Sequence, residues 1–171
     1  EDAKLALSAM AAFHAQWWGH GSIPELSSTF LPIKNPIYLA ALPGVFGAGW
    51  ENAQRFGADV LTPETIEFGN RYGDLVPWLL TEVSEPATFS HGDWRSDNVF
   101  FGSPKGVTVI DFQICGFGTG LYDVAYFVGG SVDEAHRSGN DEMLVRHYLS
   151  ELAANGVDYD FDEAWYKYRV V

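Results

Sequence analysis

The sequence of 171 residues has little cysteine, little positive charge and no long apolar run. Its one cysteine, Cys115, cannot form an intramolecular disulfide, which excludes a disulfide framework and leads us to expect a reducing, cytoplasmic location. Ten Lys and Arg residues stand against 23 Asp and Glu residues, for a net charge of −13, so we expect neither nucleic acid nor an anionic membrane as partner. No apolar run approaches the ~20 residues of a membrane span, and the acidic first residues do not form a signal peptide.

The chain does have ample material for one folded core. Hydrophobic residues make up 47% of the sequence and aromatic residues 15%. A chain of this size buries roughly 70% of the surface that its unfolded form exposes. Composition and length therefore exclude a disordered protein and predict a single globular domain.

Both ends of the sequence have the appearance of cut ends. Residue 1 is Glu rather than Met, and apolar side chains recur at helical spacing almost at once, from Met10 to Trp17. At the other end, Asp160 begins a predicted helix that reaches Val171 without a terminating Gly or Asn. We therefore expect the chain to be part of a longer protein.

Helical patterns account for most of the sequence. Four prolines between residues 22 and 44 predict that this stretch lacks long regular structure. Thr62 followed by Pro63 marks the start of a helix, which Gly69, Gly73 and Pro77 are expected to interrupt. The other helices are predicted over residues 3–18 (ended by Gly19 and Gly21), 45–57, 121–129 and 140–155.

The middle of the chain carries three short β-branched or aromatic runs. Strands are predicted over residues 87–91, 98–101 and 107–112. The five residues 102–106, GSPKG, suit the turn of a hairpin between the second and third strands. The sequence therefore predicts an α+β fold, mostly helical, with a small β-hairpin element.

Polar residues gather where these short strands end. Asp93 and Asn98 are five residues apart across a loop, and Asp111 ends the next predicted strand. Phosphoryl transfer requires a carboxylate that accepts the proton of the attacking hydroxyl, together with hard oxygen ligands that hold Mg²⁺ against the nucleotide. The protein-kinase signature has the same layout.

The segments SHGDWRSDNVFF (90–101) and VTVIDFQICGFGTGLYDVAYFVGG (107–130) resemble the aminoglycoside phosphotransferase/choline kinase family, which has a protein-kinase-like fold. Gln113 after Asp-Phe resembles the choline-kinase-like, or ecdysteroid-kinase-like, branch. The resemblance covers residues 90–129 closely and extends weakly to the first helix. It implies that residues 1–171 are the C-terminal lobe, with the hairpin element carrying the catalytic and metal-binding loops. It also implies that an N-terminal nucleotide lobe is absent from this chain.

The resemblance also implies a role for each residue of the site. Asp93 would be the catalytic base, with His91 bracing its loop. Asn98 and Asp111 would hold Mg²⁺ or Mn²⁺, with ATP as co-substrate. Asp123 would hydrogen-bond the backbone of the catalytic loop from the following helix. Possible substrate or nucleotide contacts are Trp94, Arg95 and Gln113.

Two departures from protein kinases point to a small-molecule hydroxyl as acceptor. Gln113 replaces the Gly of the Asp-Phe-Gly motif. Only eleven residues separate Asp111 from Asp123, too few for a long segment that docks a peptide. The acidic helices after residue 130 are expected to bind the acceptor and to favour a neutral or cationic one.

Other interpretations remain open. The chain could be a non-catalytic nucleotide- or metabolite-binding domain of kinase ancestry that regulates a fused or partner protein. A metal-dependent hydrolase that uses His91, Asp93 and Asp111 is a further alternative. Asp123 could be an acid in the first turn of a helix, and Trp94 and Arg95 could simply cover the loop. We expect Asp97 to be solvated, and we expect core positions for His14, Trp17, Trp18 and the thiol of Cys115.

Overall fold

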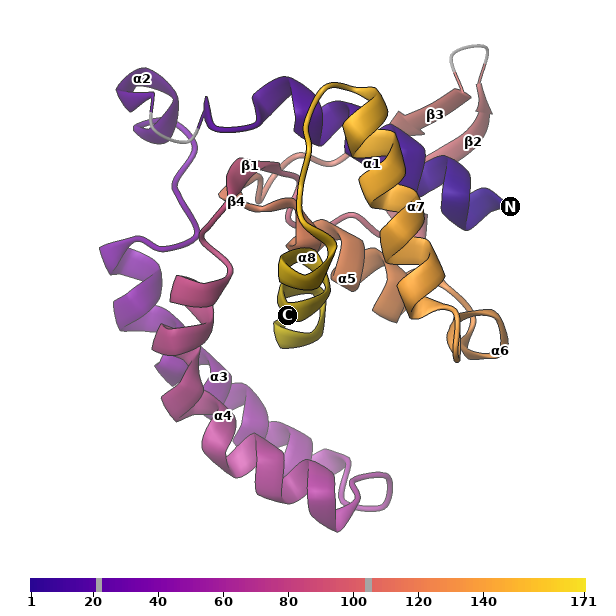
Figure 1. Cartoon of the computed structure of the whole chain (residues 1–171). Helices are drawn as coiled ribbons and strands as arrows, with labels where there is room; N and C mark the ends of the chain where they lie inside the picture. Colours follow the sequence, from indigo (N-terminus) through magenta and orange to yellow (C-terminus); the bar gives the residue numbers. More distant parts are fainter. Residues whose placement is uncertain (21–22, 104–105) are drawn as a thin grey trace.

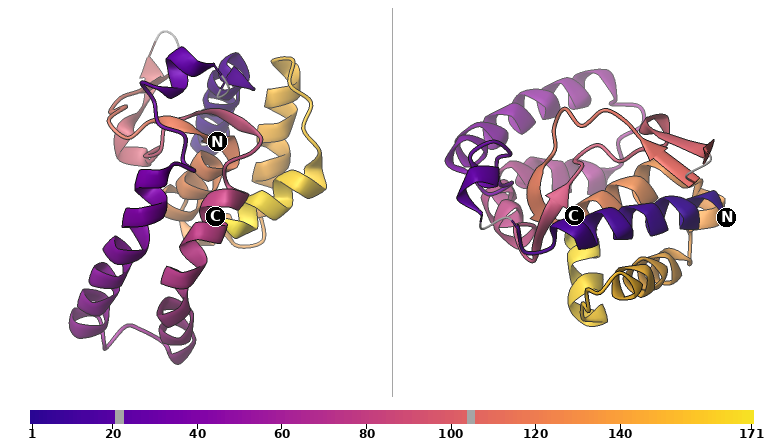
Figure 2. Two further views of the ribbon diagram at one scale, coloured as in Figure 1. Left: turned by 90° about the vertical axis from the view of Figure 1, so that its left-hand side faces the viewer. Right: turned by 90° about the horizontal axis from the view of Figure 1, so that it is seen from above.

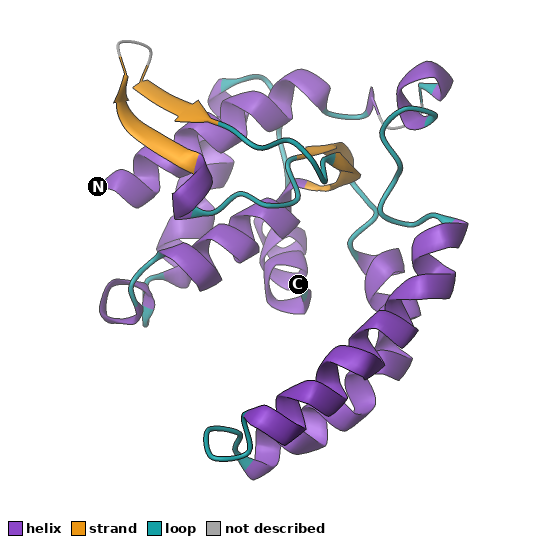
Figure 3. Ribbon diagram, turned by 180° about the vertical axis from the view of Figure 1, so that it is seen from behind, coloured by secondary structure: helices purple, strands orange, loops and turns teal. Residues whose placement is uncertain are grey.

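The computed structural model describes residues 1–20, 23–103 and 106–171, and it is a mostly helical α+β fold (Figure 1). The helices are α1 (Asp2–Trp17), α2 (Pro24–Ser27), α3 (Pro36–Phe56), α4 (Pro63–Glu82), α5 (Gly120–Ser131), α6 (Glu134–Arg137), α7 (Asp141–Ala154) and α8 (Phe161–Val170), with a 3₁₀ turn η2 (Ser96–Asn98). The strands are β1 (Ala87–Ser90), β2 (Val99–Ser103), β3 (Gly106–Val109) and β4 (Gly116–Thr119). Two separate antiparallel pairs result, β1 with β4 and β2 with β3 (Figure 3).

The core lies between helices from both ends of the chain. Helix α1 packs along α7, and α5 lies beneath both (Figures 1 and 2). Burying an aliphatic side chain of this kind stabilises a fold by about 1.5–3 kcal/mol. The large side chains of this core without solvent exposure are Leu7, Met10, Leu121, Val124, Val128, Val145, Tyr148 and Leu152.

Helices α3 and α4 form an antiparallel pair, here called the arm, that projects away from the core (Figures 1 and 2). The prediction that residues 22–44 lack long regular structure is wrong from Pro36 onward, because the side chain of Asn35 accepts hydrogen bonds from the N–H groups of Ile37 and Tyr38 at 3.0 Å. Pro36 occupies the first helical position, where a missing N–H costs nothing. The chain therefore starts a helix here and continues it through Pro43.

The second helix of the arm begins where the sequence predicts, since Thr62 accepts a hydrogen bond from the N–H of Thr65 at 3.2 Å. The expected interruption at Pro77 is wrong, because α4 continues to Glu82. Gly69 is buried against the Trp50 ring of α3, and a Cβ atom at Gly69 would lie 2.3 Å from that ring. This glycine permits close packing of α3 on α4.

The predicted hairpin is present, with Val99 opposite Val109 in antiparallel register. Its third predicted run ends at Val109 rather than at residue 112, and residues 104 and 105 of the predicted turn lie outside the described residues, as does Gly21. Strand β4 was not predicted. A Cβ atom at Gly116 would lie 2.4 Å from the carbonyl oxygen of Leu31, so the glycines of β4 let the backbone of a neighbouring segment approach closely.

The last two helices begin and end close to the predicted positions. Helix α7 ends at Ala154, and Gly156 follows with a φ of +91°, the left-handed conformation that favours glycine after a helix. The side chain of Asp160 accepts a hydrogen bond from the N–H of Glu163 at 3.0 Å and starts α8. Among the described residues, no helix is both long and apolar enough to cross a membrane.

Candidate active site

The loop between β1 and β2 holds Asp93 and Asn98 against each other. The side-chain amide of Asn98 donates to the backbone carbonyl of Asp93 at 2.9 Å and to its carboxylate at 3.0 Å. Asn98 is 8% exposed, whereas Asp93 is half-buried and open to solvent on one side. Because both bonds use the amide nitrogen, the amide oxygen of Asn98 remains available as a ligand.

His91 joins this loop to the segment that carries Asp111. Its ring is fully buried, with Nε2 2.9 Å from the carbonyl oxygen of Ile110. Its Nδ1 accepts a hydrogen bond from the N–H of Asp93 at 3.2 Å. Since a carbonyl oxygen only accepts, Nε2 carries the proton, and both ring nitrogens are occupied within the protein. The His91 ring therefore links the backbone at Asp93 to the backbone at Ile110.

Asp123, at the start of α5, accepts hydrogen bonds from the backbone of the same loop. One carboxylate oxygen accepts from the N–H of His91 at 2.7 Å and the other from the N–H of Gly92 at 2.9 Å. Burial by itself raises the pKa of this carboxyl, but hydrogen bonds from His14, His91 and Gly92 outweigh it, and the pKa is lowered. Asp123 is therefore ionised and holds the loop from below.

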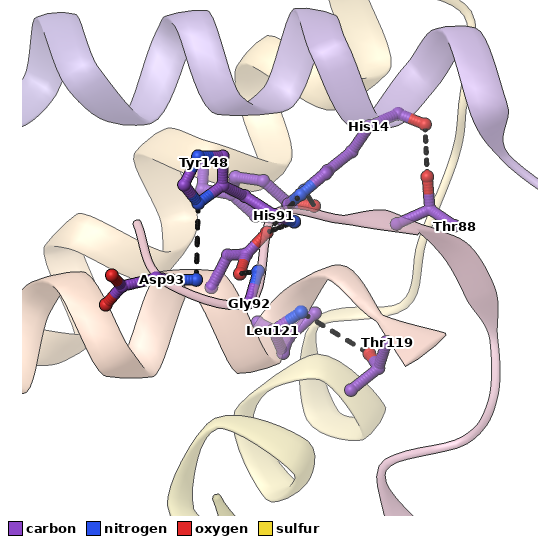
Figure 4. A network of polar contacts seen from close by, with 9 residues as sticks. His14, Thr88, His91, Gly92, Asp93, Thr119, Leu121 and Tyr148 are labelled. Atoms are coloured by element: carbon purple, nitrogen blue, oxygen red, sulfur yellow. Dashed lines mark hydrogen bonds and ion pairs between the residues drawn. The ribbon is translucent and has the colours of Figure 1, made fainter. Parts of the chain in front are cut away.

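A buried network continues from Asp123 into α1 and α7 (Figure 4). His14 Nε2 lies 3.1 Å from a carboxylate oxygen of Asp123, and His14 Nδ1 lies 2.9 Å from the hydroxyl of Tyr148. Thr88 donates to the backbone carbonyl of His14 at 2.6 Å. Sequence reasoning predicted His14 as a core residue but missed these contacts. The available signal was a histidine on an apolar helix face, because a buried polar group requires partners.

Asp111 lies just beyond the end of β3. Strand β3 pairs with β2, which begins directly after Asn98. The N–H of Ile110 donates to the backbone carbonyl of Asn98 at 3.0 Å, which brings the two segments together. Asp111 itself is exposed, and the amide of Gln113 lies 3.5 Å from its carboxylate. Its φ of +67° falls in the left-handed region, which a non-glycine residue seldom adopts.

The donor set fits a hard cation that is completed by other ligands. Asn98 offers an amide oxygen and Asp111 a carboxylate, both of the type that Mg²⁺ prefers. In the part of the chain that the structure describes, no group of three or more His, Cys, Asp or Glu residues could hold a metal ion. Two protein oxygens suit Mg²⁺ in its usual setting, where substrate phosphates and waters supply the remaining ligands.

The two residues after the candidate base differ in their surroundings. Trp94 is 2% exposed and packs against the rings of Phe13, His14 and His91. Of the two roles considered for Trp94, the structure supports packing beneath the loop rather than a ligand contact. Arg95 is exposed and pairs with Asp97, which is solvated as expected.

Tyr126 of α5 is a neighbour of Asp93 that the sequence did not indicate. Burial, followed by a hydrogen bond to Asp93 and the charge of that carboxylate, raises the pKa of the Tyr126 hydroxyl. The phenol therefore stays protonated and donates. Its ring stacks on Tyr122, with ring centroids 6.0 Å apart. Tyr126 lies two turns into α5 from its first residues, so no motif in the sequence marks it.

Two cavities lie beside this loop. One, of about 700 Å³, has a mixed lining that includes Arg95, Asp97 and Tyr126. The other, the apolar cavity of about 580 Å³, lies between the arm and the core. Its wall includes Gly92, the residue before Asp93. Aliphatic and aromatic side chains of the arm and core dominate its lining, among them Leu42, Phe46, Val76, Leu80, Ile114 and Phe117.

The cavities differ from the expected acceptor site. Residues after position 130 contribute little to either lining, namely Ser131, Val170 and Val171. The arm, whose residues 36–44 were predicted to lack long regular structure, supplies most of one wall instead. Cys115 is half-buried rather than fully buried, and burial raises the pKa of its thiol.

Comparison with known proteins supplies an independent indication. No curated protein and no solved structure matches the chain. The model of the ecdysteroid kinase-like family matches residues 63–158, which is more than half of the chain. This range contains the loop with Asp93 and Asn98, the segment with Asp111, and the start of α5 with Asp123. The chain therefore belongs to the ecdysteroid kinase-like family.

Proposed function

We propose that this chain is the C-terminal lobe of an ATP-dependent phosphotransferase that phosphorylates a hydroxyl group of a small molecule. The observation that supports this most strongly is the hydrogen bond from the Asn98 amide to the Asp93 carboxylate at 3.0 Å. The N–H of Ile110 also donates to the carbonyl of Asn98, so the segment with Asp111 lies next to this pair. Phosphoryl transfer requires a carboxylate base next to oxygen ligands for a metal. Membership of a kinase-like family supports the same class of reaction.

In this proposal, the oxygen of the acceptor hydroxyl bonds to the γ-phosphorus of ATP, and Asp93 accepts the proton that this hydroxyl loses. The bond between that phosphorus and the bridging oxygen of ADP breaks. Asn98 and Asp111 would hold Mg²⁺ or Mn²⁺, which when bound neutralises charge on the phosphate oxygens. A nucleotide lobe would supply the loop that covers the phosphates and the lysine that contacts them.

The acceptor in this proposal has an apolar body. The apolar cavity is large enough for a compact polycyclic or branched molecule, and it reaches the loop at Gly92, next to Asp93. An apolar body in the cavity would bring a hydroxyl group toward the loop at Gly92, next to Asp93 in the sequence. The lining of this cavity favours an apolar alcohol over the cationic acceptor that the acidic surface suggested.

The experiment that tests the function is the substitution Asp93→Asn in the protein that contains this chain and its nucleotide lobe. Loss of a positioned base typically slows a reaction by about 10²- to 10⁴-fold. Asn keeps an oxygen that can accept from Asn98, so folding and ATP affinity should stay unchanged. Turnover is measured with ATP and a panel of apolar alcohols.

The matched control is Asp158→Asn, which removes the same charge from an exposed position outside the site. Its turnover should stay within about threefold of the unmodified protein. Equal turnover of the Asp93→Asn and Asp158→Asn variants would show that Asp93 is not the base.

A further inference from the structure

We propose that His14 and Tyr148 are positioning residues that fix the shape of the catalytic loop through Asp123. This inference rests on the proposed function for its meaning, but it concerns residues that lie outside the motif of the loop. His14 comes from α1 and Tyr148 from α7, and neither lines either of the two cavities described above. Their effect on the reaction would therefore pass entirely through the buried network of Figure 4.

The direction of each hydrogen bond in the network follows from chemistry. An ionised carboxylate only accepts, so the proton between His14 Nε2 and Asp123 resides on the histidine. Burial raises the pKa of Tyr148 well above its usual value, so its hydroxyl is protonated and can donate to His14 Nδ1. A continuous chain of donors then runs from Tyr148 through His14 to Asp123.

Solvent does not reach the side chains of this network, so water cannot replace a hydrogen bond that one of them loses. His14, Thr88, His91, Asp123 and Tyr148 all have 0% exposed surface. A buried carboxylate that loses a donor cannot replace it with solvent, and leaving such a group unsatisfied carries a large penalty. The same Asp123 oxygen that accepts from His14 also accepts from the N–H of His91 at 2.7 Å. Removal of His14 would therefore free Asp123 to shift and would displace the backbone on which Asp93 stands.

Packing around the network leaves no room for an alternative arrangement. A Cβ atom at Gly120 would lie 2.6 Å from His14 Nδ1 and 2.6 Å from the hydroxyl of Tyr148. Thr88 anchors the backbone of His14 with a bond of 2.6 Å. Contacts with Gly120, Tyr148 and Thr88 therefore restrict the position of His14, as expected of a residue that orients the Asp123 carboxylate.

The chain offers a matched control in His147, the neighbour of Tyr148 on α7. His147 also joins α7 to α1, since its Nε2 lies 3.0 Å from the hydroxyl of Ser8 and 3.1 Å from the carbonyl oxygen of Lys4. Within the described part of the chain, His147 makes no hydrogen bond to Asp123 or to the loop between β1 and β2. A change in α1–α7 packing alone should therefore affect His14 and His147 variants alike.

The experiment compares Tyr148→Phe, His14→Ala, His14→Gln and His147→Gln in the protein with its nucleotide lobe. Loss of a residue that orients a reacting group typically costs about 10- to 100-fold in activity. We expect His14→Ala and Tyr148→Phe to lower kcat by about this factor while KM for ATP stays within about twofold. The Gln amide can donate to Asp123, so His14→Gln should recover most of kcat. His147→Gln should match the unmodified protein.

A second measurement does not depend on turnover. Hydrogen exchange of the His91 and Gly92 amides, followed by NMR in the protein with its nucleotide lobe, reports whether Asp123 still holds the loop. Exchange should be about tenfold faster or more in His14→Ala and in Tyr148→Phe, and unchanged in His147→Gln. Because Tyr148→Phe removes a single oxygen atom, it decides the matter even where His14→Ala does not fold.

Unchanged kcat and unchanged exchange in Tyr148→Phe, and in His14→Ala where that variant folds, relative to His147→Gln, would overturn the inference. Faster exchange with unchanged kcat would also overturn it, because the network would then be structural only. An unmodified protein without any turnover would instead refute the proposed function.

Discussion

Asp111 adopts a backbone conformation that its own side chain does not favour. A non-glycine residue at φ +67° carries a strain of about 1 kcal/mol or more, and such strain persists where a side chain is needed in that place. Glycine would relieve it, and alanine would not. Substitutions of Asp111 can therefore distinguish two effects: relief of backbone strain, which changes stability, and loss of the carboxylate, which removes a candidate metal ligand.

We predict that neither Asp111→Gly nor Asp111→Ala retains metal binding, although Asp111→Gly is more stable than Asp111→Ala by about 1 kcal/mol. In the unmodified protein with its nucleotide lobe, Mg²⁺ or Mn²⁺ should bind only when ATP supplies further oxygens. Calorimetric titration of Mn²⁺ with and without ATP, together with urea unfolding, measures both effects. Tight metal binding without ATP that persists in Asp111→Ala would contradict the assignment.

Asp123 makes the fold sensitive to acid. Its pKa is lowered in the folded state, so its contribution to the free energy of unfolding is complete above the unfolded value of about 3.9 and is lost as the pH falls below it. Unfolding of the unmodified chain should therefore become easier as the pH falls below about 4. The Asp123→Asn variant should show a flatter dependence than the exposed Asp158→Asn variant. Parallel curves for both variants would count against this assignment.

At the scale of elements, the sequence predicts those parts whose signals are local. Thr62-Pro63 and Asp160 mark helix starts through their own side chains, and the hairpin follows from alternating apolar runs around a glycine-rich turn. The motif with Asp93 and Asn98 is also local, so its loop could be identified. Residue types and spacing were sufficient in each of these cases.

The elements that were missed depend on distant neighbours. Helix α3 passes through Pro43 because packing against α4 outweighs the lost hydrogen bond. Asn35-Pro36 was a local start signal, but four prolines nearby obscured it. Strand β4 exists because Gly116 fits under the Leu31 carbonyl, a contact 85 residues away in the chain. His14 and Tyr126 likewise acquire their partners only in the folded protein.

The arm offers a test of where the acceptor binds. Leu42 of α3 lines the apolar cavity, while the neighbouring Ala41 is exposed and does not. We predict that Leu42→Trp, by filling the cavity, raises KM for an apolar acceptor by about 10-fold or more and leaves KM for ATP unchanged. Ala41→Trp adds a bulky ring outside the cavity and should behave as the unmodified protein. Equal acceptor KM values in the two variants would place the acceptor elsewhere.

At the scale of the whole molecule, the surface around the hairpin is rich in exposed large apolar side chains. The hairpin and the segment after it expose large hydrophobic side chains beside the candidate metal ligands, namely Phe100, Phe101, Ile110, Phe112 and Ile114. Exposed apolar patches of this kind mark surfaces that other structures cover. In the proposed function, this face meets the nucleotide and the second lobe.

We predict that the 171-residue chain alone turns over no acceptor and that it self-associates at higher concentration. In the proposed function, positioning of the triphosphate is most of the catalysis, and this chain supplies only one side of it. An ATP-consumption assay with and without the added nucleotide lobe measures the first effect, and sedimentation measures the second. Acceptor-dependent turnover by the chain alone would refute the two-lobe mechanism.

The contact between His14 and Tyr148 spans 134 residues of sequence. During synthesis the ribosome adds about 5–20 residues per second, so several seconds pass between the appearance of these two side chains. The loop with Asp93 is synthesised well before α7. The hydrogen-bond network beneath the loop can therefore form only after α7, with Tyr148, has been synthesised. The candidate site is thus among the last parts of this chain to take its final form on the ribosome, after the arm and both strand pairs have been made.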